Sequence, residues 1–172
     1  MKNISVVLGA LLALVGIGAA AQTPTDAQIV AIIVTANQVA IEAGRTAEKS
    51  GHAREVKAFG NQMVTDHTGV KKQAMALVKK LKLTPEENPM SESLQSGGVE
   101  NLKALKELKA ADFDKAYIDQ EVAYHEQMIE ALEKTLIPSA QNAELKALLI
   151  AVRPGYLGHL AHAKRIQFVL AK

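Results

Sequence analysis

Apolar residues recur every three or four positions along most of the chain after residue 25, which is the spacing of an amphipathic helix. This pattern predicts four long helices at residues 25–49, 53–83, 112–136 and 140–171, and a shorter helix at residues 99–110. No stretch of strand length alternates between apolar and polar residues. We therefore expect an all-helical protein.

Short polar and helix-breaking residues set the expected ends of these helices. Thr25 and Gln28 form a capping box at the start of the first helix. Pro154 lies inside the last helix and is expected to kink it, because proline lacks the N–H that bonds to the preceding turn. The first three long helices are expected to end at Gly51, Pro85 and Pro138.

The connection between the second and third long helices, residues 84–111, is much longer than the other connections. Two antiparallel helix pairs that are joined by one long crossover form the ferritin-like arrangement. A plain up-and-down bundle would need only a few residues there. We therefore expect a ferritin-like four-helix bundle whose crossover carries the short extra helix.

Residues 1–21 have the pattern of a secretory signal peptide. Lys2 gives a positive start, an apolar run follows, and small residues at 19–21 provide a cleavage site. A membrane span needs about 20 apolar residues, so a retained N-terminal anchor is the less favoured alternative. No Cys follows the run, which excludes a lipid-anchored lipoprotein. Residues 22–172 are expected to form a single domain.

The composition excludes several classes of protein. The chain of 172 residues has no Cys, so it has no disulfides, no thiolate metal ligands and no cysteine nucleophile. Its 20 Lys and Arg nearly balance its 18 Asp and Glu, so we expect no nucleic-acid partner. The sequence also lacks a phosphate-binding loop and a nucleophile elbow. No catalytic residue is therefore assigned.

Three of the five histidines fall on apolar helix stripes: His67, His125 and His159. Each lies within about one turn of the midpoint of its own predicted helix, and the midpoints of antiparallel helices of similar length share one layer of a bundle. Glu42 of the first helix lies near the same level. We therefore expect these four side chains to meet in the bundle core. His52 and His162 are expected at the surface.

Neutral imidazole and carboxylate groups suit zinc, iron, copper or manganese. The layer is therefore a candidate site for one divalent transition-metal ion or a small ligand, with Asp66, Tyr117 and Glu121 as hydrogen-bonding partners behind the ligands. The alternative is a structural or stress-related envelope protein that binds no metal, in which the histidines only satisfy the core and bond to Tyr117, Tyr156 or a carboxylate.

Several short motifs carry a family resemblance: residues 41–44 with Glu42, residues 63–67 with Asp66 and His67, residues 112–117 with Tyr117, His125, and Pro154 followed by His159. With these motifs, residues 22–172 resemble a family of exported bacterial ferritin-like domains of unknown function, which are often described as membrane or outer-membrane proteins. The resemblance implies a helical bundle in the periplasm or at the outer membrane and no established reaction. Its motif positions correspond to Glu42, Asp66, His67, Tyr117, His125 and His159.

The chain departs from true ferritins and di-iron oxidases, which place Glu-x-x-His on two helices. Here Val64 lies three residues before His67, and Tyr156 lies three residues before His159. This difference disfavours a di-iron oxidase and leaves a mononuclear site open. Non-catalytic binding is therefore the expected function, and a metal-dependent oxidoreductase is a further alternative.

Overall fold

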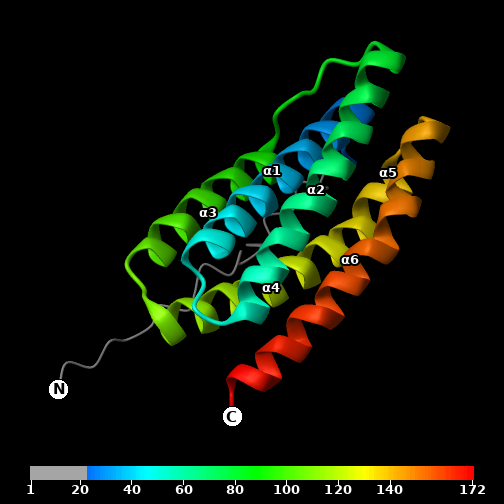
Figure 1. Cartoon of the computed structure of the whole chain (residues 1–172). Helices are drawn as coiled ribbons and strands as arrows, with labels where there is room; N and C mark the ends of the chain where they lie inside the picture. Colours follow the sequence, from blue (N-terminus) through cyan, green and yellow to red (C-terminus); the bar gives the residue numbers. More distant parts are fainter. Residues whose placement is uncertain (1–22) are drawn as a thin grey trace, which may run out of the picture.

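The computed structural model describes residues 23–172, which are helical apart from short connections and contain no strand. The segment expected to be a signal peptide, residues 1–21, lies outside the described residues. Five helices of 18 residues or more make up the described part of the chain: α1 Asp26–Ser50, α2 Arg54–Leu81, α3 Pro89–Lys106, α4 Ala110–Ala131 and α6 Ala143–Leu170 (Figure 1).

Helices α1, α2, α6 and α4 contact one another in that cyclic order, so together they enclose a shared interior. Helix α3 lies along α1 on the outside of this group (Figure 1). It carries the chain from the end of α2 back to the end of the molecule where α2 began, and α4 starts there (Figure 1). The expected long crossover with an extra helix is therefore present.

The start of α3 differs from the expectation of a helix at residues 99–110. The helix begins at Pro89, because the Asn88 side chain accepts hydrogen bonds from the backbone N–H of Met90 and of Ser91 at 3.2 Å each. The two glycines at 97 and 98 do not interrupt it. A Cβ at Gly98 would lie 2.8 Å from a methyl carbon of Val39, so this glycine allows α3 to approach α1 closely.

Helix α4 also continues further than expected. It passes through a π-helical turn, η1 Leu132–Leu136, into the short segment α5 Ile137–Ser139, so Pro138 does not end the helix. The wider turn lies just before Pro138, where the proline ring would otherwise clash with the carbonyl group four residues earlier. Helix α6 runs through Pro154 without a break. The capping box of Thr25 and Gln28 is present as expected.

Two aspartates tie the ends of the helices together. Ala53 precedes α2, and its methyl side chain cannot cap the helix. The buried Asp114 of α4 replaces such a cap, because its carboxylate accepts from the backbone N–H of His52 at 2.8 Å and of Ala53 at 2.6 Å. Asp26 of α1 accepts from the backbone N–H groups of residues 141 and 142 before α6, at 2.9 Å each. Each pairing fixes the end of one helix against another.

The apolar core is divided into two clusters along the length of the molecule. One cluster contains Ile29, Ile33 and Leu132, and the other contains Phe59 and Phe113. On α2 and α6 the boundary between the two clusters falls at a buried histidine, and on α4 it falls between Val122 and Tyr124, next to the buried His125. The core therefore has a polar layer between two apolar halves.

Helix α1 is the one helix in residues 23–172 that is long and apolar enough to cross a membrane by length and composition. In this structure, 61% of its most apolar 18-residue window is buried inside the protein. These properties fit the central helix of a helical core equally well.

Candidate functional site

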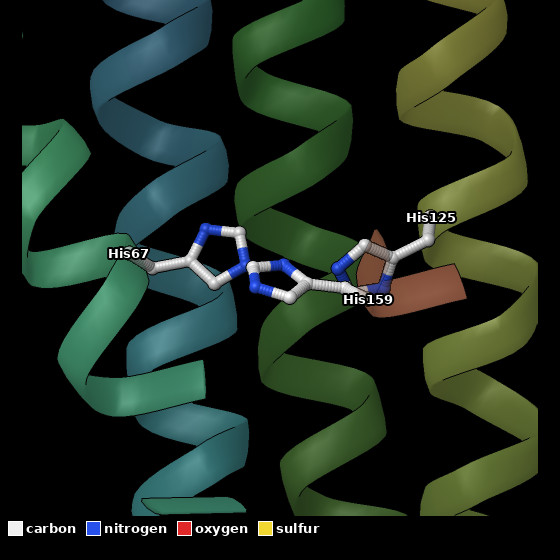
Figure 2. A group of neighbouring side chains, drawn as sticks. All are labelled: His67, His125 and His159. Carbon is white, nitrogen blue, oxygen red and sulfur yellow. The ribbon is translucent and has the colours of Figure 1, made fainter. Parts of the chain in front are cut away.

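His67 of α2, His125 of α4 and His159 of α6 meet in the polar layer between the two apolar clusters. The three residues are 1%, 0% and 7% exposed. One ring nitrogen of each lies within 4.8 Å of the others, and the ring centroids are 5.2 to 5.7 Å apart. Figure 2 shows the three rings pointing toward one another from different helices. The fold thus brings together three residues that are far apart in the sequence.

Each ring is held from behind by an oxygen atom. Nδ1 of His67 lies 2.8 Å from Oδ1 of Asn37, whose amide nitrogen donates to the Ile33 carbonyl at 2.7 Å. Nδ1 of His125 lies 2.8 Å from the Glu121 carbonyl oxygen. Nε2 of His159 lies 2.9 Å from Oδ2 of Asp66. Because all three partners are acceptors, the network assigns the proton of each neutral ring to the nitrogen that faces its partner.

The second nitrogen of each ring has no hydrogen-bond partner among the described residues. These atoms are Nε2 of His67, Nε2 of His125 and Nδ1 of His159, and all three are buried. In a neutral imidazole whose other nitrogen is protonated, such an atom carries a lone pair. Buried polar atoms rarely lack a partner. A histidine that is held through one nitrogen and offers the other is typical of a metal ligand.

The electrostatic surroundings favour neutral rings. Burial lowers the pKa of His67 well below its ordinary value of 6.5, and the neighbouring His125 and His159 lower it further. Burial lowers the pKa of His125 to about 4. Neutral imidazole is the form that binds a metal ion. At neutral pH these two rings are therefore ready to act as ligands without first losing a proton.

The structure does not bring Glu42 to the histidines, which corrects the expected set of four. Glu42 lies on a partly exposed face of α1, and its Oε1 accepts from Nε2 of Gln38 at 2.5 Å. Asn37 is the α1 residue that reaches the layer. It comes five residues earlier than Glu42, which is about 7.5 Å along the axis of a helix. The sequence does hold a signal for Asn37: it lies four residues after Ile33, on the apolar stripe of α1 that faces the core.

The other three residues expected behind the ligands lie near the histidines. Asp66 is exposed and holds His159. Glu121 is 3% exposed, and its Oε2 lies 3.4 Å from Nδ1 of His125. Burial raises the pKa of Glu121 to about 8, so its side chain is largely protonated at neutral pH. Burial, and then the adjacent Glu121, raise the pKa of Tyr117 well above 10. Glu121 and Tyr117 thus form a buried polar pair behind His125.

A surface cavity of about 230 Å³ between α2 and α6 reaches two of the three histidines. We call it the α2–α6 groove. Solvent therefore has a path to the histidine layer from this side, and His125 lies beyond the residues that line the groove. The lining consists of Asp66, His67, Val70, Gln73, Ala151, Val152, Gly155, Tyr156 and His159.

The remaining two histidines lie outside the layer. His52 is exposed in the connection between α1 and α2, as expected. His162 was expected at the surface but is only partly exposed: its ring packs edge-on against Phe59, with centroids 5.2 Å apart, and its Nδ1 lies 3.0 Å from Oε1 of Gln62.

Comparisons of the chain with curated proteins and with solved structures give no match. Residues 16–166 match the model of one protein family, described as Domain of unknown function (DUF4142). The matched region contains all three histidines of the layer and the residues that hold them. The chain therefore belongs to the DUF4142 family, a family of unknown function.

Proposed function

We propose that the protein binds one divalent transition-metal ion through His67, His125 and His159 in the core of a ferritin-like four-helix bundle. Two observations on the same three buried rings carry this proposal: a ring nitrogen of each lies within 4.8 Å of the others, and one nitrogen of each has no partner among the described residues. Binding of the ion, rather than catalysis, is the proposed activity.

The arrangement of the helices supports the ferritin-like part of the proposal. Two helix pairs, α1 with α2 and α4 with α6, are joined by the crossover that contains α3 (Figure 1). In ferritin-like proteins, metal sites are built in the core from side chains of facing helices. The signal-peptide pattern of residues 1–21 supports export to the periplasm or to the outer membrane.

The set of ligands favours zinc, copper or iron. Zn–N bonds of about 2.0–2.1 Å in a tetrahedral site place the ligand nitrogens roughly 3.3 Å apart. The nitrogens here lie within 4.8 Å of one another, so binding of an ion would draw the rings closer by up to about 1.5 Å. Imidazole ligands suit these three metals, whereas manganese prefers oxygen ligands.

The alternative in which the histidines serve only the core explains less of this arrangement. A buried polar atom without a partner costs about 1–3 kcal/mol of stability. The hydroxyl groups of Tyr117 and Tyr156 are buried without a partner and so do not bond to these nitrogens. A ring could donate to its neighbour only by giving up the hydrogen bond to Asn37, to the Glu121 carbonyl or to Asp66. A metal ion satisfies all three lone pairs at once and keeps these hydrogen bonds.

Replacement of His67 by Ala is expected to weaken metal binding at least about 100-fold, or roughly 3 kcal/mol. The reason is that the two remaining rings leave half of a four-coordinate site to other ligands. We would purify the untagged protein without chelators and measure its zinc, copper, iron and manganese by mass spectrometry. Zinc affinity would then be measured by competition with a coloured chelator.

His52→Ala is the matched control, because His52 is exposed and lies outside the layer. It should keep one equivalent of metal with the affinity of the wild type. Circular dichroism of both variants distinguishes a lost ligand from a lost fold. The proposal fails if the folded wild type takes up less than a tenth of an equivalent of each metal after reconstitution, or if folded His67→Ala binds like His52→Ala.

A further inference from the structure

The described residues supply three ligands to the proposed ion and not four. Within residues 23–172, no further His, Asp or Glu side chain joins His67, His125 and His159 in this cluster of possible ligands. The nearby carboxylate of Asp66 is already hydrogen-bonded to the ring of His159. Metal sites with three protein ligands leave a position for a molecule from solution.

The α2–α6 groove leads to this position from outside. His67 and His159 are part of its lining, so a molecule in the groove lies against two of the three ligands. The volume of about 230 Å³ is several times the roughly 30 Å³ that one water molecule occupies in the liquid. The groove therefore has space for a ligand of several atoms.

The charges at the site indicate what kind of molecule fits. A divalent ion with three neutral imidazoles has a net charge of two, and the bound ion is the dominant local charge in such a site. Asp66 is the one charged side chain in the lining of the groove. The walls are mixed: Val70, Ala151 and Val152 are apolar, and Gln73 adds an amide. These features favour a small anion of single charge over a large or highly charged one.

We infer that the histidine-bound metal ion has an open coordination position that faces the α2–α6 groove, where a small monovalent anion binds as the fourth ligand. This inference rests on the proposed metal site and adds the class of ligand and its route to the ion.

Gly155 provides a way to close the groove without touching the histidines. It lines the groove, and a Cβ built at this position would meet no atom within 4 Å. A large side chain there therefore extends into open space. Gly158 is the matched control: it is exposed on the same helix, a Cβ there also meets no atom within 4 Å, and it does not line the groove.

The test uses the protein loaded with one equivalent of cobalt(II), whose visible spectrum responds to a change of ligand. Cobalt content is measured first, and sodium azide is then added to the wild type, Gly155→Phe and Gly158→Phe. We expect azide to change the spectrum of the wild type and of Gly158→Phe in a saturable manner. In Gly155→Phe, the azide affinity should fall at least about tenfold, which is 1.4 kcal/mol.

The possible failures are distinguishable. If the wild type binds one equivalent of cobalt and azide leaves its spectrum unchanged, the open position is refuted and the metal site stands. If Gly155→Phe binds azide as tightly as Gly158→Phe, the groove is not the route and the inference is overturned. If the folded wild type binds no cobalt, zinc or copper, both the metal site and the inference fall.

Discussion

Glu121→Gln is expected to stabilise the metal-free protein by roughly 5 kcal/mol at pH 9 and by less than about 1 kcal/mol at pH 5. The reason is that burial raises the pKa of Glu121 from 4.5 to about 8. Between these two values the unfolded chain has released the proton that the folded protein keeps. The stability that protonated Glu121 contributes is therefore fully present below pH 4.5. As the pH rises from 4.5 toward 8, the free energy of unfolding falls by about 1.4 kcal/mol per pH unit.

The buried histidines act in a different pH range. The pKa of His125 is lowered to about 4, so the folded protein holds this ring neutral while the unfolded chain protonates it below pH 6.5. The contribution of neutral His125 to the free energy of unfolding is therefore fully present above pH 6.5, and it is lost as the pH falls toward 4. The pKa of His67 is also lowered, and its effect has the same sign. Between pH 6.5 and 8, the decline in stability comes from Glu121 alone among these groups.

The measurement is urea unfolding followed by circular dichroism at several pH values from 5 to 9, with a chelator present. Glu126→Gln is the matched control, because Glu126 lies on the same helix with its side chain 51% exposed and paired with Lys164. Its curve should follow that of the wild type and decline above pH 6.5. A wild-type stability that stays level between pH 6.5 and 8 would contradict a protonated Glu121 in the folded protein.

Asp114→Ala is expected to lower the free energy of unfolding by about 3 kcal/mol. The carboxylate of Asp114 is 1% exposed and accepts the backbone N–H groups of His52 and Ala53 at the start of α2. Hydrogen bonds to a charged group contribute about 1.5–3 kcal/mol each, and two bonds to one carboxylate are not fully additive. The substitution also removes a negative charge from the positive end of the α2 dipole.

Chemical and thermal unfolding of Asp114→Ala and Asp112→Ala test this role. Asp112 is exposed two residues earlier in the first turn of α4, so its replacement should change stability by no more than about 1 kcal/mol. Asp114→Asn should be intermediate, because an amide oxygen still accepts but carries no charge. Equal stabilities of Asp114→Ala and Asp112→Ala would show that the buried carboxylate does not hold the start of α2.

Local sequence patterns predicted the helical class and most of the helix ends. The capping box at Thr25 is fully local, so it was visible in the sequence. The two glycines before Val99 were misleading, because Gly98 serves the contact with Val39 on another helix and not a break. The Asn88-Pro89 pair is a local signal for the true start of α3, but the prediction placed it in a loop. At Pro138, the π-helical turn that lets α4 continue has no simple local signal.

The candidate site was predictable where it depends on position within a single helix. His67, His125 and His159 lie on apolar stripes near the middles of their helices, and the fold brings them together. The residue that α1 contributes to the layer was predicted wrongly, because the sequence does not show the axial offset between two packed helices. In the structure that offset selects Asn37 and leaves Glu42 on a partly exposed face.

We propose that His67, His125 and His159 hold one metal ion. The most direct measurement is the X-ray absorption spectrum of the protein loaded with one equivalent of zinc. We predict three imidazole nitrogens at about 2.0–2.1 Å, with the outer-sphere scattering of imidazole rings, and a loss of imidazole scattering in His67→Ala. A zinc shell made only of oxygen ligands, or an imidazole contribution that is the same in His67→Ala, would contradict the claim.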